Sequence, residues 1–546
     1  MLEYLMLSVF YFLIIFTTGF LLILKISHGK IKNIEFMSIY LLGFITLSIL
    51  NSYFSLFFPI NRNVTLGFAL ISFFFIILHK RKFIDYISGL RSSSLVDVIS
   101  IFFIILINLF FSSSGIYNYD SGLYHVQTIK WIQNFPVIPG LGNFHGRFAF
   151  NSMYFPISAA FSLNNSDTLI FPLTTITFIV FLIWQYFNLK KYILKRDIKG
   201  VGLTFSIVLP LFGYFSNWIS SPSADVICSI FSVIILQLIV NNTKGKIYNL
   251  ILISLVFLLT SYKLSMVPLT LLTLFYINST TLFKDIIKIS VLAIFILLPF
   301  FIRNYYLSGY LIYPFPDIDL FSPDWKIPLS DVVNEKSLIK SWAIKPHVHF
   351  SKVLVQPTIE WFSDWFLRQT TILKLVLLIS VTTPFIAFKT MFNGKFMQLK
   401  IVSILIVCIS FWLYNAPDTR FILGILVFTS SYTLFLTIDL FNNRVIKTLS
   451  LIYLIVIIPT LSIKPILSMS LNTYNSFQED KNLFIRSAHF NNNPLAFKKE
   501  LKNFEYFTPI NGDQCFNCDI PCTPYPKNDL IMRGKNFYKG FKIKEK

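Results

Sequence analysis

Long apolar segments alternate with short polar connections along most of this chain of 546 residues. Because a helix needs about 20 apolar residues to cross a bilayer, each segment predicts one spanning helix. The pattern therefore predicts an all-α integral membrane protein with about 12 to 14 transmembrane helices. The segments lie at 5–24, 35–58, 64–79, 95–113, 168–189, 200–219, 224–241, 289–302, 371–388, 401–414, 420–438 and 447–463.

One further apolar stretch, 247–278, is interrupted by the polar sequence Ser-Tyr-Lys-Leu-Ser around Lys263. A lysine in the middle of a span is costly unless the backbone opens around it. We expect two short helices that meet at this break, with one long tilted helix as the alternative.

The composition agrees with a membrane protein: 55% of the residues are hydrophobic and only 13% are charged. The net charge of +21 is spread over short connections, and no basic domain of the kind that binds nucleic acid is formed. We therefore expect lipid, and no nucleic acid, among the partners.

Basic residues gather in every second connection, which indicates the cytoplasmic side of the membrane. On this assignment the chain starts outside, with a transmembrane domain over 1–464 and a small extracytoplasmic tail over 465–546. The loops expected on the outer face are 114–167, 220–223, 303–370 and 415–419. The basic connections hold Lys25, Lys30 and Lys32; Lys80, Arg81 and Lys82; Lys190, Lys191, Lys195 and Arg196; Lys244 and Lys246; Lys284 and Lys288; Lys389 and Lys395; and Arg444 and Lys447.

Three cysteines, Cys515, Cys518 and Cys522, cluster in the tail sequence GDQCFNCDIPCTPYP. Such a cluster is typical of a disulfide with one cysteine left over, or of a zinc site. No nearby histidine supplies a fourth zinc ligand. On the outer face we favour a disulfide between Cys515 and Cys522 that staples the tail to the outer loops.

The most unusual polar sequence, NYDSGLYHVQTIKWIQNFPVIPGLGNFHGRFAFNS at 118–152, follows the fourth apolar segment. Asp120 begins its predicted helix, where a carboxylate commonly serves as the N-cap. The alternative is a general base at the membrane boundary, with its pKa raised toward neutrality by partial desolvation. We favour the general base.

His125 lies five residues further on, where it can orient a substrate hydroxyl or phosphate; an amphipathic interface residue is the alternative. The Pro-Gly-Leu-Gly sequence at 139–142 then breaks the helix. Glycines in such a loop let backbone amides approach an anion closely. The candidate binding residues on this irregular backbone are His145, Arg147 and Asn151.

Further polar residues are expected at helix ends on the same side: Asp225, Lys263, Arg303, Asp418 and Arg420. Four of these have a purely structural alternative. Asp225 can cap its helix, Lys263 can extend to the membrane surface, and an Asp418–Arg420 ion pair can fix the turn between two helices.

With its aspartate in the first large outer loop, the amphipathic helix that follows it and the late Ala-Pro-Asp-Thr-Arg-Phe turn, the chain resembles the GT-C superfamily of membrane glycosyltransferases. The sequences DSGLYH, PGLGNFHGRFAFN and GDQC…PCTPYP are also similar to a poorly characterised group of bacterial multi-pass membrane proteins. The resemblance covers roughly 95–430 and implies a GT-C-like fold. The chain departs from the superfamily pattern in having three helices before the catalytic loop and no Asp-Asp or Asp-Glu pair.

The resemblance implies an inverting transfer of a sugar from a polyprenyl-phosphate carrier to a glycan, glycolipid or protein acceptor, with Asp120 as the base. The site would face the periplasm or exterior of a bacterial inner membrane. No resident cofactor is implied, and a divalent metal stays an unsupported alternative, because His347 and His349 stand alone in a loop. Trp325, Trp342, Trp361 and Trp365 would stack on sugar or anchor the outer loop at the interface.

Two other classes of function compete with this one. A transporter or flippase of a lipid-linked or small anionic substrate predicts polar residues in the middle of several helices, whereas apart from Lys263 the segments are nearly free of charge. An outer-face polymerase or ligase that joins glycan chains shares the donor type and is not separated from a transferase by the sequence.

Overall fold

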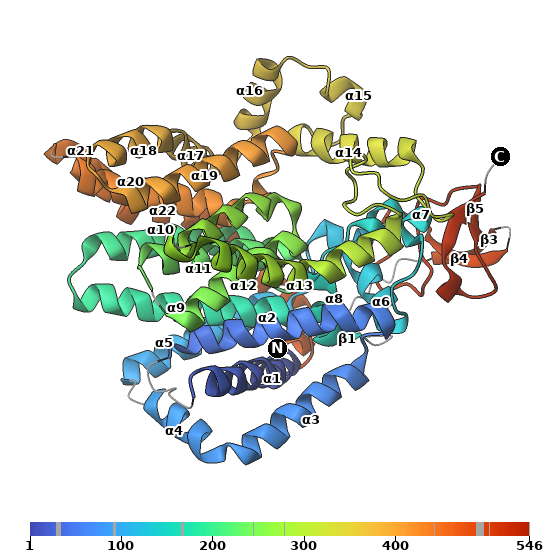
Figure 1. Ribbon diagram of the computed structural model, residues 1–546, viewed down its shortest axis with the longest axis horizontal. Helices are drawn as coiled ribbons and strands as arrows, with labels where there is room; N and C mark the ends of the chain where they lie inside the picture. Colours follow the sequence, from blue (N-terminus) through green and yellow to red (C-terminus); the bar gives the residue numbers. More distant parts are fainter. Residues whose placement is uncertain are drawn as a thin grey trace.

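The computed structural model describes residues 1–28, 34–90, 94–164, 169–243, 245–277, 279–441, 443–487, 496–501 and 503–544. Lys30, Lys32 and Lys244, three of the basic residues assigned to the cytoplasmic side, lie outside this part of the chain. The molecule is a bundle of long helices with a small strand-containing segment at one end (Figure 1).

Within the described residues, ten helices are long and apolar enough to cross a membrane. This confirms an all-α membrane protein, but the number is below the 12 to 14 spanning helices that the sequence predicted, because several of the predicted segments form shorter helices. The ten are α1 (Leu2–Ile26), α2 (Phe36–Phe57), α5 (Leu95–Ser113), α9 (Pro172–Leu194), α10 (Ile198–Phe215, continued by η3, Ser216–Trp218), α13 (Leu282–Ser308), the pair α17 (Thr371–Val381) and α18 (Thr383–Phe392), α19 (Phe396–Asn415), α20 (Leu423–Leu440) and the run α21 (Arg444–Ile452), η7 (Tyr453–Ile457) and α22 (Ile458–Glu479).

An eleventh span is formed if α3 (Arg62–Leu78) and α4 (Lys80–Leu90), which meet at an angle of 87°, are counted together. Three shorter apolar helices, α11 (Ala224–Val240), α12 (Lys246–Tyr262) and the 3-10 helix η4 (Leu264–Tyr276), complete the bundle. The break expected around Lys263 is confirmed, because α12 ends and η4 begins there with extended backbone at that residue.

Close helix packing depends on small residues. A Cβ at Gly19 of α1 would lie 1.8 Å from the carbonyl oxygen of Ile39, and one at Gly43 of α2 would lie 1.9 Å from that of Ile15. Glycines at both positions therefore let the two backbones touch, a common device where helices associate in lipid.

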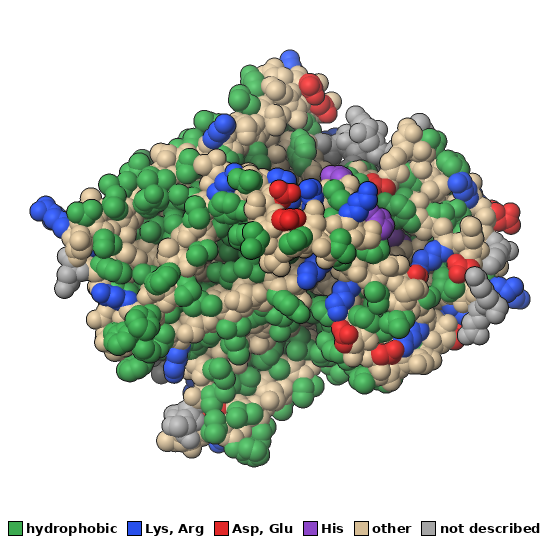
Figure 2. Space-filling model, turned by 90° about the horizontal axis from the view of Figure 1, so that it is seen from above, with side chains coloured by type: hydrophobic (Ala, Val, Ile, Leu, Met, Phe, Trp, Pro, Cys, Tyr) green, Lys and Arg blue, Asp and Glu red, His purple; other side chains and the backbone are tan. Residues whose placement is uncertain are grey.

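The two ends of the bundle differ in character. Hydrophobic side chains cover a broad band of the surface, whereas acidic and histidine side chains concentrate toward the end that carries the C-terminal segment (Figure 2). Helices α4 and α21, with their basic connections, lie at the opposite end (Figure 1). This polarity matches the alternation of basic connections in the sequence.

The loop after α5 folds into short elements rather than one surface helix. A π-helical turn that buries Leu123 leads into α6, which buries Val126 and Ile129. The elements are η1 (Ser121–His125), α6 (Val126–Asn134), α7 (Leu141–Phe144), η2 (Gly146–Ala149), α8 (Tyr154–Ala160) and the antiparallel pair β1 (Leu163–Asn164) and β2 (Leu169–Ile170).

The loop after α13 and the tail also carry regular structure. Because α22 continues to Glu479 through Pro465, the tail begins later than the boundary at 464–465 that the sequence predicted. The loop after α13 holds α14 (Leu329–Ile344), α15 (Phe350–Val353) and α16 (Thr358–Arg368). Two short 3-10 helices lie elsewhere: η5 (Ser279–Thr281) precedes α13, and η6 (Thr419–Phe421) follows α19. The tail holds η8 (Lys481–Phe484), the antiparallel pairs β3 (Ala496–Leu501) with β4 (Phe504–Pro509) and β5 (Leu530–Met532) with β6 (Phe541–Ile543), and η9 (Phe537–Lys539).

The cysteine prediction is confirmed. Cys515 and Cys522 form a disulfide, and Cys518 is buried in the same loop. The zinc alternative is thereby set aside for this cluster, since two of its three sulfur ligands are bonded to each other.

Candidate functional site

A cavity of about 1090 Å³ opens at the end of the bundle that carries the tail. It is bounded by the loop after α5, the first turn of α11, the break between α12 and η4, the helix α14, the end of α19 and the tail. A volume of this size accommodates a drug-sized or larger ligand. Of the predicted site residues, those that line it are Asp120, His125, His145, Arg147, Asn151, Asp225, Lys263, Asp418 and Arg420.

Asp120 lies at the start of the π-helical turn η1, and its side chain makes no capping hydrogen bond. Asn118 provides the cap instead, since its Oδ1 accepts from the backbone N–H of Asp120 at 2.9 Å. The capping alternative for Asp120 is therefore wrong. Its two carboxylate oxygens meet two arginines: Oδ2 lies 2.7 Å from Arg420 Nη1 and Oδ1 lies 3.4 Å from Arg147 Nη1. Single π-helical turns of this kind are frequent at functional sites.

The expectation that desolvation raises the pKa of Asp120 toward neutrality is wrong. Burial does act in that direction, but the positive charges of Arg420 and Arg147 outweigh it and lower the pKa to about 2. At neutral pH the side chain is thus an ionised carboxylate shared between two guanidinium groups.

Arg420 is the centre of the cluster. Asp418 binds it with both carboxylate oxygens: Oδ1 accepts from the backbone N–H of Arg420 at 3.1 Å, and Oδ2 accepts from Nε of Arg420 at 2.8 Å. The turn itself is fixed by two buried indoles, since Trp412 donates to the carbonyl of Asp418 at 2.7 Å and Trp365 donates to that of Pro417 at 2.8 Å. The predicted Asp418–Arg420 pair is confirmed, and it leaves Nη1 free to reach Asp120.

Asp225 and Lys263 form a second ion pair on the same cavity wall. Ser223, not Asp225, caps α11: its hydroxyl accepts from the backbone N–H of Asp225 at 3.3 Å. The second oxygen of Asp225 lies 4.0 Å from Arg420 Nε, and Lys263 Nζ stands 3.7 Å above the ring of Phe421. Three aspartates and three cations therefore make one continuous charged cluster.

Arg147 is the least constrained cation of that cluster. Among the described residues its ion pair is with Asp120; this is the longer of the two that the carboxylate makes, and the Arg147 side chain is 35% exposed. Its guanidinium also lies 5.9 Å from the centre of the Tyr124 ring. An incoming anion can displace it from Asp120 at smaller cost than Arg420, which holds two carboxylates at hydrogen-bond distance.

Both histidines are neutral at physiological pH. Burial lowers the pKa of His125 to about 4 and that of His145 to about 3, with the charge of Arg147 adding to the effect on His145. His125 lies 3.3 Å from the Ser121 hydroxyl and packs on Tyr124. Neither ring can act as a fixed positive charge, and both can hydrogen-bond to a neutral group.

Arg303 differs from the other predicted cations because it is buried behind the cavity wall. Its Nη1 donates to Ser55 Oγ at 3.0 Å, and its Nε donates to Asn151 Oδ1 at 3.3 Å. It thus positions Asn151, whose amide also donates to the carbonyl of Phe300 at 2.9 Å.

A family model matches residues 1–427, more than three quarters of the chain. The chain belongs to the family described as Domain of unknown function (DUF8201). No curated protein and no solved structure matches it.

The DUF8201 match contains all six members of the charged cluster, whereas the tail residues on the cavity wall lie beyond it. The tail was not expected to line the cavity. Tyr119 and Glu335 were also missed, although the first is adjacent to Asp120 in sequence. The lining residues missed by sequence reasoning include Tyr119, Tyr124, Asp331, Glu335, Lys336, Lys340, Asp513, Tyr525 and Lys527.

Glu335 of α14 is the most distinctive of these. Its side chain is partly buried, and burial raises the pKa of its carboxyl group. In the part of the chain that the structure describes, no group of three or more His, Cys, Asp or Glu side chains is arranged to hold a metal ion. Of the four tryptophans that the sequence singled out in the loop after α13, Trp342 lines the cavity, while Trp365 is buried and donates to the turn before Arg420.

Proposed function

We propose that the protein is a membrane glycosyltransferase of the GT-C type. It would move a sugar from a polyprenyl-phosphate carrier to an acceptor on the outer face of a bacterial inner membrane, in the synthesis of an envelope glycan or glycolipid. The observation that carries the proposal is the continuous cluster of three cations and three carboxylates on the wall of a large cavity at the end of the spanning helices.

The cations supply the site for the donor. Arg147 has the weakest ion pair and the most exposed head of the three, so the donor phosphate is placed on Arg147, with Arg420 and Lys263 behind it. Fixed positive groups in a partly dry cavity stabilise the charge that develops on a leaving phosphate.

Displacement of Arg147 toward the phosphate also prepares Asp120 to act as the base. When Arg147 turns to the phosphate, Oδ1 of Asp120 is released, while Arg420 keeps Oδ2 in place. Loss of one neighbouring positive charge raises the basicity of the carboxylate. Proton acceptance by Asp120 is thereby coupled to the arrival of the donor.

The reaction is a single displacement. The acceptor hydroxyl oxygen attacks the anomeric carbon and forms the new C–O bond, while the bond between that carbon and the phosphate oxygen breaks. The electron pair of the broken bond leaves with the phosphate, and the hydroxyl proton goes to Asp120. The configuration at the anomeric carbon is inverted.

Binding of the donor headgroup is tested by native mass spectrometry of the purified protein with undecaprenyl phosphate and, separately, phosphatidylglycerol. We expect preferential binding of undecaprenyl phosphate, and an about tenfold loss in Arg147→Gln, which corresponds to about 1.4 kcal/mol. Arg533→Gln is the matched control, since that arginine pairs with Asp324 away from the cavity. Equal binding of undecaprenyl phosphate by wild type and Arg147→Gln would overturn the placement of the phosphate.

Transfer is tested in the producing organism. A strain without the gene should accumulate a polyprenyl-phosphate-linked sugar in its lipid extract, and the wild-type gene should remove it. The accumulated lipid should be accessible from outside the membrane. Accumulation on the cytoplasmic leaflet would instead support the flippase alternative, and no accumulation would contradict a transferase.

A further inference from the structure

The C-terminal tail forms one wall of the cavity and not only a support for the outer loops. Asp513, Tyr525 and Lys527 all line the cavity, although they follow α22 by more than 30 residues. Lys527 joins this wall to the opposite one through an ion pair of 2.6 Å with Asp331 in the first turn of α14.

The tail is clamped onto the helix that starts at Asp120. Phe516 in the disulfide loop donates its backbone N–H to the carbonyl of Gly122 at 2.9 Å. A Cβ at Gly122 would lie only 2.5 Å from the ring of Phe516, so the glycine leaves room for this ring to pack on the turn. The fit binds the loop directly to the turn that carries Asp120.

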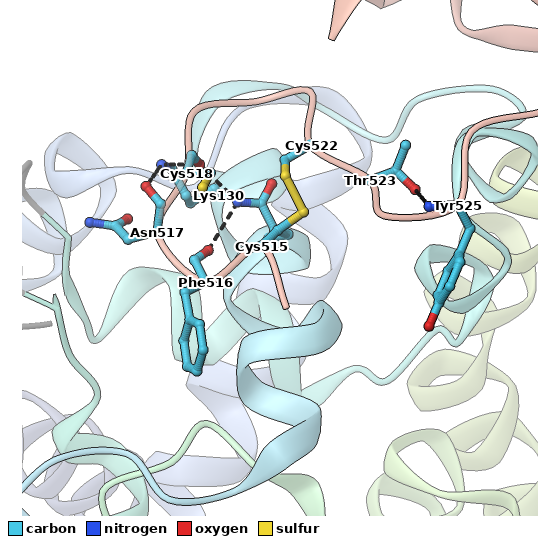
Figure 3. Close-up of a disulfide and its surroundings, with 9 residues drawn as sticks. Lys130, Cys515, Phe516, Asn517, Cys518, Cys522, Thr523 and Tyr525 are labelled. Carbon is cyan, nitrogen blue, oxygen red and sulfur yellow. Dashed lines mark hydrogen bonds between the residues drawn. A yellow bond between two sulfur atoms is a disulfide. The ribbon is translucent and has the colours of Figure 1, made fainter. Parts of the chain in front are cut away.

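Two side chains of α6 complete the clamp. Gln127 Nε2 donates to the carbonyl of Cys518 at 2.8 Å, and Lys130 Nζ donates to the carbonyls of Asn517 and Cys518 at 2.9 and 2.8 Å (Figure 3). The disulfide between Cys515 and Cys522 closes the loop that presents these carbonyls. The backbone carbonyls of the disulfide loop thus hold the tail against the loop after α5 that carries Asp120.

These contacts bring Tyr119, Tyr525 and Asp513 together on the cavity wall, where the two rings and the carboxylate form what we call the aromatic rim. The hydroxyls of Tyr119 and Tyr525 both donate to Asp513, the second at 2.9 Å. Yet the two residues are 55% and 54% exposed, so their rings remain open to the cavity. The edge of His145 packs beside Tyr525, with 5.7 Å between ring centres.

These groups have the chemistry of a carbohydrate site. A sugar presents C–H faces that pack on aromatic rings and hydroxyls that donate to a carboxylate. The cation of this wall, Lys527, is already paired with Asp331, so the rim favours a neutral polyhydroxyl group over an anion. Tyr119 precedes Asp120 directly in the chain, which places the rim beside the reacting carboxylate.

We propose that Tyr119, Asp513 and Tyr525 form a subsite for a carbohydrate acceptor, held next to Asp120 by the disulfide-closed tail. This inference rests on the proposed transferase function and narrows its acceptor to a glycan or glycolipid. The donor cluster lies within residues 1–427, whereas the acceptor rim combines Tyr119 of that part with Asp513 and Tyr525 of the tail.

The test uses the strain without the gene, complemented with full-length variants. Tyr525→Ala is compared with Tyr538→Ala, an equally exposed tail tyrosine at 53% that packs on Phe135 and does not line the cavity. We expect Tyr525→Ala to raise the lipid-linked sugar about tenfold over the wild-type complement, the change that a loss of about 1.4 kcal/mol gives. Tyr538→Ala should match wild type. Native mass spectrometry should show unchanged binding of undecaprenyl phosphate in both.

The outcomes separate the two proposals. If the strain without the gene accumulates no lipid-linked sugar, the transferase function fails. If it does accumulate the sugar but Tyr525→Ala behaves as Tyr538→Ala does, only the acceptor subsite is overturned. If Tyr525→Ala does not yield a folded protein, Asp513→Asn carries the same test, because it removes the charge and keeps the side-chain volume.

The class of acceptor has its own readout. Surface polysaccharide, glycolipid and protein fractions of the Tyr525→Ala strain are analysed for sugar content. Loss of one sugar from the polysaccharide or glycolipid fraction is expected. Loss from the protein fraction alone would overturn a carbohydrate acceptor.

Discussion

Asp97 lies in the first turn of α5 and Asp120 in the loop that follows this helix, and both are mostly buried carboxylates beside a cation. Asp97 has every partner it can use: it closes a capping box with Ser94, accepts from Tyr186 at 2.7 Å and pairs with Lys190 at 2.6 Å. All these groups belong to the ends of two packed helices. Such a carboxylate fixes structure.

Asp120 makes no cap, shares Arg420 with Asp418, and meets Arg147 only at 3.4 Å. It also faces a cavity of about 1090 Å³, against about 260 Å³ beside Asp97. The difference teaches that burial and an ion pair do not by themselves identify a functional carboxylate. Exchangeable partners and room for a ligand do.

The largest expected effect is on transfer. Asp120→Asn should reduce the rate at which lipid-linked sugar is consumed by at least about 100-fold, because it removes the proton acceptor. Mass spectrometry of lipid extracts from complemented strains measures this. If the Asp120→Asn variant consumes the donor at the wild-type rate, Asp120 is a structural carboxylate like Asp97.

The second effect is on stability. Arg420→Gln should lower the free energy of unfolding by about 3 kcal/mol, because the buried carboxylates around it lose their shared cation. Thermal and denaturant unfolding in detergent micelles measure the loss. Arg147→Gln should cost much less, since its one ion pair is longer and more exposed. Equal losses in the two variants would contradict the central position of Arg420.

The third prediction concerns the structural carboxylate. Asp97→Asn should lower Tm on the order of 5 °C, since it removes the ion pair with Lys190 and the charged partner of the Ser94 capping box, while transfer in complemented cells stays at the wild-type level. If an Asp97→Asn variant that still folds and reaches the membrane loses transfer, Asp97 is not only structural and does not differ from Asp120 in this respect.

The smallest effect depends on pH. Burial raises the pKa of Glu335, so the ionised form of its carboxyl group is disfavoured in the folded state. Relative to the unfolded chain, this group therefore contributes its full stabilisation at a pH below the ordinary carboxyl pKa. The contribution is lost as the pH rises through the raised pKa of the folded state. Glu335→Gln should therefore raise Tm at pH 7.5, and the gain should vanish toward pH 4.

Thermal unfolding across that pH interval measures the difference. Glu505→Gln, on the exposed side of β4 and paired with Lys498, serves as the control. A gain that is the same at every pH would show that titration of Glu335 is not its cause.

The sequence alone determined the features that depend on local pattern. Runs of apolar residues predicted the spanning helices, Lys263 predicted the break between α12 and η4, and cysteine spacing predicted the disulfide of Cys515 with Cys522. Each depends on residues close together in the chain, where hydrophobicity, helix geometry and loop closure act directly.

Only the tertiary structure decided which polar residues meet. Asp120 and Arg420 are 300 positions apart, and Tyr119 reaches Asp513 over 394. The order in which similar apolar helices pack determines such encounters, and no local pattern encodes that order. For the same reason the pKa of Asp120 moved opposite to expectation: burial followed from its position, but the two arginines that overcome it came from elsewhere in the fold.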